Sequence, residues 1–309
     1  MKIYNERDLR RLNWFGLKPM IASLILFPPV NFVFRVLGRN LLTKKQALRY
    51  PISTREVRYR LENGAQVTLL DPARDDVARS VYWGEGSPVS PAESHVLRCV
   101  EALCGQYRTF LDIGAFSGLF ALLAARSNAQ LRSIAFEIVP ENFLLLMRNI
   151  IENDLVGRVE ARLCGLAGEP GWMTMAPELK LDRLASSMSI GSEFKTGVQI
   201  PLATIDGEMT DAIGPVLMKI DVEGFEAEVL RGGMTFLERH RPDVICEILP
   251  DSKDHQEIQD MLSALGYEYF LFTDNGLIRS KTITPTKEGR DWLFCADTKR
   301  LLSKIKLAS

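Results

Sequence analysis

Short apolar runs alternate with longer amphipathic stretches from residue 91 to the end of the chain. The apolar runs predict strands at residues 109–113, 133–137, 158–163, 216–221, 243–248, 268–273 and 292–296. Apolar residues at helical spacing predict helices between strands, for example over residues 91–103 and 141–149. Because strands that alternate with helices pair in parallel, the pattern predicts an α/β fold with a doubly wound, seven-stranded, mostly parallel sheet.

The last two predicted strands have no helix between them. Residues 274–291 are rich in glycine, proline, threonine and charged residues. A parallel pair needs a crossover of about a dozen or more residues, usually helical. The strand at 292–296 is therefore predicted to insert antiparallel into the sheet.

Two shorter regions precede this domain, which we place at residues 91–309. Residues 51–90 contain two alternating segments, 57–60 and 66–69, separated by Asn63 and Gly64. Because Asn-Gly favours tight primed turns, this region is predicted to be a small antiparallel hairpin followed by a linker. Residues 1–50 form an apolar and basic arm.

Within the arm, residues 19–34 are almost wholly apolar and are flanked by lysines and arginines. The run is shorter than the roughly 20 residues of a spanning helix, and Pro28 and Pro29 interrupt it. The long, mixed-charge leader before it disfavours a secretory signal. Two interpretations stay open: the arm packs on the domain or on a second subunit, or residues 14–39 rest as a peripheral anchor on the inner membrane surface.

Composition limits the kinds of binding partner and the cellular compartment expected for this protein. The 38 basic and 39 acidic residues leave a net charge of -1, so the chain has no basic footprint for nucleic acid. The five cysteines are scattered and form no Cys-x-x-Cys pair, which disfavours a disulfide framework and a structural zinc site. These features favour a reducing, cytoplasmic location.

The end of the first strand carries an acid followed by a glycine turn. Asp112 precedes Gly114, and Ser117 is predicted to cap the next helix, with Gly118 in its first turn. The spacing is D-x-G-x-x-x-G, whereas a dinucleotide fold needs G-x-G-x-x-G to seat pyrophosphate. S-adenosylmethionine (SAM) has no phosphate and carries a cationic sulfonium, which suits Asp112 electrostatically. The alternative is that Asp112 only caps its own loop.

The next two strand ends fit a nucleoside. Glu137 ends the second strand, where an acid can accept hydrogen bonds from both hydroxyls of a ribose. Cys164 lies in an apolar turn that suits the side of an adenine ring, although a plain core role is an equal alternative. Glu93, ahead of the first strand, lies in a region that similar folds use near the cofactor. The candidate cofactor-binding residues are Glu93, Asp112, Gly114, Ala115, Ser117, Gly118, Glu137, Cys164 and Asp221.

The fourth strand ends in a cluster of carboxylates. Asp221 and Glu223 share one face two residues apart, and Glu247 ends the neighbouring strand. Neighbouring acids can raise one pKa toward that of a general base, so these three are the candidate catalytic residues. Two alternatives stay open, namely a Mg²⁺ site, which we do not assign, and a structural role such as pairing with Lys219. Residues 168–198 form a long loop that is the candidate for acceptor recognition.

Taken together, residues 85–296 resemble the FkbM family of SAM-dependent methyltransferases. The resemblance rests on FLDIGAFSG at 110–118, FEIVPENFLLLMRNI at 136–150, Thr204-Ile205-Asp206, KIDVEGFEAEVLRGG at 219–233 and RPDVICEI at 241–248. It implies the Rossmann-like sheet of class I SAM methyltransferases, SAM as methyl donor and usually an oxygen acceptor. Two residues depart from the family pattern: Phe116 stands where asparagine is usual, and Ile138 where proline is usual.

The leading hypothesis is therefore a SAM-dependent methyltransferase that O-methylates a hydroxyl of a sugar, glycolipid or natural product. One alternative is an NAD(P)-dependent oxidoreductase, which the missing third glycine and the absence of a Tyr-x-x-x-Lys pair disfavour. The other alternative is a non-catalytic SAM-binding module that acts through its arm. The expected partner is a small-molecule or glycan acceptor rather than nucleic acid.

Overall fold

An eight-stranded sheet forms the centre of the protein. The computed structural model describes residue 27 and residues 29–33, 52–175 and 197–308. The strand order is β12-β11-β13-β10-β9-β3-β4-β5. The strands are β3 (Thr109–Ile113), β4 (Arg132–Glu137), β5 (Val159–Leu163), β9 (Val216–Ile220), β10 (Asp243–Glu247), β11 (Glu268–Thr273), β12 (Gly276–Ser280) and β13 (Asp291–Cys295).

The predicted parallel sheet is confirmed, with one strand more than expected. Strands β5, β4, β3, β9 and β10 pair in parallel, and β13 inserts antiparallel between β10 and β11, as predicted. The expectation of seven strands was wrong because β12 pairs antiparallel with β11. A tight turn ending at Gly276, whose φ is +119°, joins them, so a segment that lacked a helix pattern forms half of a hairpin.

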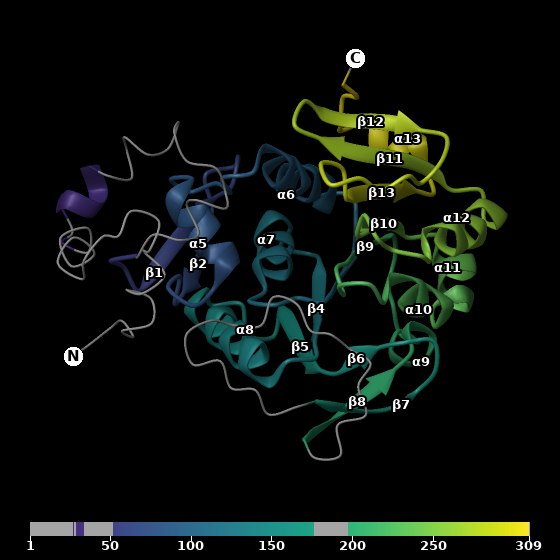
Figure 1. Cartoon of the computed structure of the whole chain (residues 1–309), viewed down its shortest axis with the longest axis horizontal. Helices are drawn as coiled ribbons and strands as arrows, with labels where there is room; N and C mark the ends of the chain where they lie inside the picture. Colours follow the sequence, from purple (N-terminus) through teal and green to yellow (C-terminus); the bar gives the residue numbers. More distant parts are fainter. Residues whose placement is uncertain (1–26, 28, 34–51, 176–196, 309) are drawn as a thin grey trace.

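Helices cover both faces of this sheet (Figure 1). One face carries α6 (Pro91–Cys104), α7 (Leu119–Ser127) and α8 (Pro140–Glu152), and the other carries α10 (Glu226–Arg231), α11 (Met234–His240) and α12 (His255–Ala264). Neighbouring strand residues point to opposite faces, so Phe110 lies in one buried apolar cluster and Leu111 in the other. The two clusters bury the two faces of the sheet and so stabilise the relative positions of its strand ends.

The predicted hairpin is confirmed as β1 (Glu56–Arg60) and β2 (Gln66–Leu70), paired antiparallel. Its main-chain N–H groups at Thr68 and Leu70 donate to the side chains of Asn153 and Asn149, at the end of α8. A short helix that the sequence pattern did not predict, α5 (Asp76–Trp83), follows the hairpin. Asp75 caps it by accepting from the N–H groups of residues 77 and 78.

The candidate acceptor loop is partly a second sheet. Strands β6 (Gly165–Leu166), β8 (Val198–Ala203) and β7 (Gly171–Met175) form it, in that order. The prediction of a loop over residues 168–198 was therefore wrong at β7, while residues 176–196 lie outside the described part of the chain. The short helices α9 (Ile205–Glu208) and α13 (Thr298–Leu302) complete the fold.

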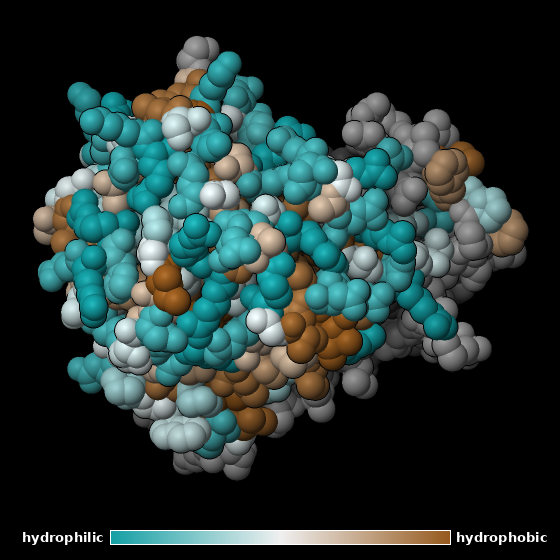
Figure 2. Space-filling view, turned by 180° about the vertical axis from the view of Figure 1, so that it is seen from behind, coloured by the Kyte–Doolittle hydropathy of each residue, from teal (hydrophilic) through white to brown (hydrophobic). Residues whose placement is uncertain are grey.

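Most of the predicted arm lies outside the described residues. Residues 29–33 are helical, and the hydroxyl of Tyr82 donates a hydrogen bond to buried Asn31. Within the described part of the chain, no helix has the length and apolar character to cross a membrane. All five cysteines are free thiols, and four of them are buried. Seen from behind, the described surface is largely hydrophilic, with apolar side chains gathered toward its lower half (Figure 2).

Candidate active site

A cavity of about 560 Å³ opens at the carboxyl ends of the central strands. An open α/β sheet binds its ligands at this edge. The cavity brings together seven of the candidate residues, which come from one helix, two strand ends and several loops far apart in the sequence: Glu93, Gly114, Glu137, Cys164, Asp221, Glu223 and Glu247. Of the remaining candidates, Asp112, Ala115, Ser117 and Gly118 lie behind the cavity wall and do not line it.

Gly114 joins the two strand ends. Its φ is +80°, and a Cβ there would overlap the main-chain carbonyl oxygen of Asp221. The N–H of Asp221 also donates to the carbonyl of Ile113, at 2.9 Å. A glycine at position 114 therefore lets the ends of β3 and β9 touch, so that one cavity is shared by both.

Asp112 lies beneath the glycine turn and is fully buried. Its Oδ2 accepts from the N–H of Ala121 at 2.9 Å, in the first turn of α7, while Oδ1 has no hydrogen-bond partner among the described residues. Burial raises its pKa to about 6, although Lys219 acts in the opposite direction. The predicted Ser117 cap was wrong: Gly118, with φ +88°, occupies the cap position, and the side chain that accepts from the first turn of α7 is that of Asp112.

Glu137 closes the other end of the same turn. Its carboxylate accepts from the N–H of Phe116 at 2.6 Å and from the N–H of Val139 at 2.7 Å. Burial raises its pKa to about 7, and these hydrogen bonds oppose the rise. Phe116 has φ +53°, a region in which asparagine is far more common than phenylalanine. The departure from the family pattern at residue 116 therefore leaves the turn conformation intact but strained.

An apolar wall lies beyond Glu137. Ile138, Cys164 and Leu166 line it, and burial raises the pKa of the Cys164 thiol. Glu93 enters the cavity from the first turn of α6, which starts at Pro91 after the Ser90 cap.

The three candidate catalytic acids meet at the opposite end of the cavity. One carboxylate oxygen from each of Asp221, Glu223 and Glu247 lies within 4.8 Å of the others. Asp221 pairs with Lys219 at 2.8 Å, and Glu247 pairs with Arg290 at 3.0 Å. These partners give the three acids different protonation states.

Asp221 is ionised and Glu247 holds a proton. Burial acts to raise the pKa of Asp221, but the charge of Lys219 and a hydrogen bond from Glu247 outweigh it, so this pKa lies below its ordinary value. Burial and the neighbouring Asp221 charge raise the pKa of Glu247 to about 9. At neutral pH the proton of Glu247 is therefore donated to Asp221.

Glu223 is the free acid of the three. It makes no ion pair or hydrogen bond with any residue in the described ranges, and it lines the cavity. Burial and Asp221 raise its pKa. Its φ is +55°, followed by Gly224 at +105°, a strained conformation that costs about 1–3 kcal/mol and often marks functional sites.

The acid cluster is poorly suited to a metal ion. Lys219 and Arg290 already supply two positive charges to the three carboxyl groups. These two cations offset most of the negative charge that would attract Mg²⁺. We therefore assign no metal to it.

The sequence did not predict several of the residues that line the cavity. It indicated Lys219 only as a structural partner of Asp221, and Arg290 enters from the loop before β13. Val77 and Ser80 enter from α5, and Met173 enters from β7. The only sequence signal for any of them is the position of Lys219 two residues before Asp221 on a strand.

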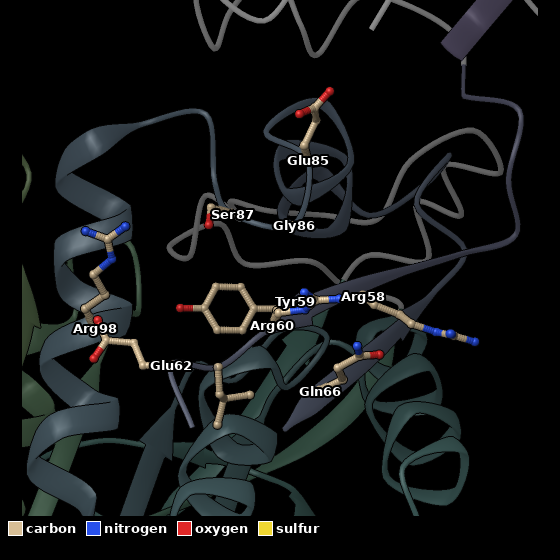
Figure 3. A pocket seen from close by; sticks show the side chains of 10 residues that line it. Arg58, Tyr59, Arg60, Glu62, Gln66, Glu85, Gly86, Ser87 and Arg98 are labelled. Carbon is tan, nitrogen blue, oxygen red and sulfur yellow. The ribbon is translucent and has the colours of Figure 1, made fainter. Parts of the chain in front are cut away.

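A second cavity of about 610 Å³ lies between the hairpin, residues 85–87 and α6. Arg58 and Arg98 stand on opposite sides of it and point away from each other (Figure 3). Glu62 and Glu85 also line this cavity, so its lining carries charges of both signs. The cavity at the strand ends is therefore the candidate active site.

This sheet, with its glycine turn and acids at the strand ends, defines an α/β enzyme of the nucleoside-cofactor-binding class. The sequence model of the Methyltransferase FkbM domain matches residues 112–269, and the chain belongs to this family. "Methyltransferase 1" from Beauveria bassiana (strain ARSEF 2860) is 30% identical over 182 residues, which cover 51% of this chain and 71% of the relative. "Methyltransferase sdnD" from Sordaria araneosa is 26% identical over 185 residues, which cover 50% and 70%.

Among solved structures, Methyltransferase FkbM from Methylobacillus flagellatus KT aligns with a TM-score of 0.42 and 16% identity. The alignment covers 71% of this chain and 54% of that chain. Membership of the family supports methyltransferase function for this chain and implies SAM as its cofactor.

The residues present fit SAM. Glu137 lines the cavity, and main-chain N–H groups and the Asn142 side chain hold its carboxylate at the strand end where an acid can accept from ribose hydroxyls. The apolar wall at Ile138, Cys164 and Leu166 suits an adenine ring. The buried Asp112 has an oxygen without a partner among the described residues, which leaves its negative charge only partly compensated beneath the position of a cationic ligand.

Proposed function

We propose that this protein transfers a methyl group from SAM to a hydroxyl group of a sugar, glycolipid or natural product. The observation that carries the proposal is the unpaired Glu223 carboxylate, with its raised pKa, at the acceptor end of the cavity. A hydroxyl must lose its proton to become a good nucleophile, and a carboxylate whose pKa lies above its ordinary value is a better general base.

The chain's own residues divide this work. Bound SAM supplies an electrophilic methyl carbon. Glu137 and the apolar wall orient the cofactor, and Gly114 lets the ends of β3 and β9 meet so that both border its cavity. Glu223 accepts the hydroxyl proton, while the Glu247 proton and the Lys219 ammonium hold Asp221 as a fixed negative charge beside it. The cavity thereby brings nucleophile and methyl carbon into line.

The first test is binding. Calorimetric titration should show that SAM binds and NADH does not. Binding of NADH without SAM would instead support an oxidoreductase and overturn the proposal.

The second test is turnover. Incubation with methyl-labelled SAM and fractionated cell extract should label a hydroxyl-bearing product. Glu223→Gln should lose label incorporation by about 10²-fold or more while SAM affinity stays unchanged, because only the proton acceptor is removed. The exposed Glu238→Gln variant is the control. Equal turnover in Glu223→Gln would remove Glu223 from the mechanism, and binding without turnover under every condition would favour a non-catalytic module.

We further propose that the protein acts in the cytoplasm and rests peripherally on the inner membrane surface through its arm. Phe27, Phe32 and Val33 support this, because each is more than half exposed. The wild-type protein should co-sediment with anionic vesicles, and a Phe27→Ser/Val33→Ser variant should do so several-fold less. Leu144→Ser, which removes an equally exposed apolar side chain on α8, is the matched control. Equal sedimentation of all three proteins would exclude the anchor.

A further inference from the structure

Lys219 is a buried cation placed between the two halves of the active site. It lies on β9, pairs in register with Asp112 on β3, and is only 6% exposed. Its Nζ is 2.8 Å from Oδ2 of Asp221 and 4.6 Å from the ring centroid of Phe120 on α7. One ammonium group thus faces the acid beneath the cofactor side and the acid of the acceptor side.

We propose that Lys219 is a positioning residue that serves both halves of the crevice, holding Asp221 in place for the acceptor and supplying the countercharge that keeps Asp112 ionised beneath the cofactor. This inference rests on the proposed methyltransferase function. In this proposal Lys219 couples cofactor binding to the charge state of the acids at the acceptor end of the cavity.

The charge balance around Lys219 supports this role. Burial acts to lower the pKa of Lys219, but Asp221 and Asp112 outweigh it and hold the pKa above its ordinary value. A buried ammonium is stable only with such partners, and removal of one partner leaves the other charge uncompensated. The charged groups that face this site are Asp112 from β3, Asp221 and Glu223 from the loop before α10, Glu226 at the start of α10, Glu247 from β10, and Arg290 from the loop before β13.

Removal of the ammonium should affect Asp112 in a pH-dependent way. Asp112 has a pKa of about 6 with Lys219 present, and the lysine charge lowers it. Without that charge the pKa rises further, so Asp112 becomes neutral over a range of pH in which the wild type is ionised. A cationic cofactor should then bind more weakly at lower pH.

The test is calorimetric titration of SAM into wild-type protein and Lys219→Met at pH 6.5 and pH 8.5. Lys219→Met should bind SAM roughly tenfold more weakly than wild type at pH 6.5, and the deficit should shrink at pH 8.5, because one pKa unit corresponds to tenfold in affinity. Lys219→Arg should restore binding. Lys253→Met, an exposed lysine, is the matched control.

A second variant, Lys219→Met/Asp221→Asn, removes both partners of the ion pair and leaves no buried unpaired carboxylate at residue 221. It provides the test if Lys219→Met alone does not fold. Asp112 still lacks its countercharge in this variant, but the charge of Asp221, which raises the pKa of Asp112, is also gone, so a smaller loss of SAM affinity at pH 6.5 is expected. An affinity that changes with pH no more than in wild type, in either variant, overturns the inference. Failure of wild-type protein to bind SAM at any pH would instead overturn the proposed function itself.

Discussion

The three carboxyl groups at the acceptor end of the cavity differ in protonation state and role because their neighbours differ. Asp221 faces an ammonium and is ionised, Glu247 shares a proton with Asp221, and Glu223 has no partner among the described residues. The sequence could place all three at one sheet edge because each follows an apolar run. It could not divide the roles, because the division depends on burial and on the contact of Asp221 with Glu247, which the parallel pairing of β9 and β10 brings together.

Arg290 allows the assignment of Glu223 as the base to be tested by pH. The Arg290 charge lowers the pKa of Glu223, against the larger effects of burial and Asp221. In Arg290→Gln the pKa of Glu223 should rise, so the base is protonated up to a higher pH. The acid limb of the kcat/KM profile should therefore move upward by roughly 0.5–1 pH unit.

The matched control for this measurement is Arg279→Gln, which removes an arginine that pairs with Glu268 on the edge hairpin. Its profile should coincide with that of wild type. A downward or absent shift in Arg290→Gln would show that another group accepts the proton.

At the scale of elements, contact between the ends of β3 and β9 makes the site. Gly114→Ala should separate them, since the added methyl group would overlap the main chain of Asp221 in a left-handed conformation. We expect a loss of roughly 3 kcal/mol or more in the free energy of unfolding, measured by urea, together with loss of SAM binding.

Gly157 provides the control, because its φ is +81° and nothing lies within 4 Å of an added Cβ. Gly157→Ala should cost only the roughly 1–2 kcal/mol of the left-handed conformation and should bind SAM normally. If the two variants lost equal stability and both kept their ligand, close packing at Gly114 would have no special role.

The elements that the sequence predicted are those with long or strongly apolar patterns. Seven of the eight strands of the central sheet, together with helices α6 and α8, were predictable because the pattern of their apolar residues is unambiguous. Strand β12 and helix α5 were missed because both are short and polar in part, and each is stabilised by a partner distant in sequence or by a single cap. Tertiary packing, rather than local preference, determines such elements.

At the scale of the whole molecule, three buried carboxyl groups make the unliganded fold less stable at high pH. Burial raises the pKa of Asp75 to about 6, of Asp112 to about 6 and of Glu137 to about 7. A carboxyl whose pKa is higher in the folded state binds more protons there than in the unfolded chain at intermediate pH. Stability therefore falls as pH rises from about 4 through these pKa values.

The unliganded protein should accordingly be more stable at pH 5.5 than at pH 8, by roughly 2–4 kcal/mol in urea unfolding. The lowered pKa of His240 opposes this trend only below about pH 6.5. Asp75→Asn keeps an oxygen that can cap α5 but removes one titrating group, so its stability should depend less steeply on pH. Asp251→Asn, on the exposed surface, should leave the slope unchanged. Greater stability at pH 8 would mean that these acids are ionised at little cost, and the electrostatic account of the cofactor side would fail with them.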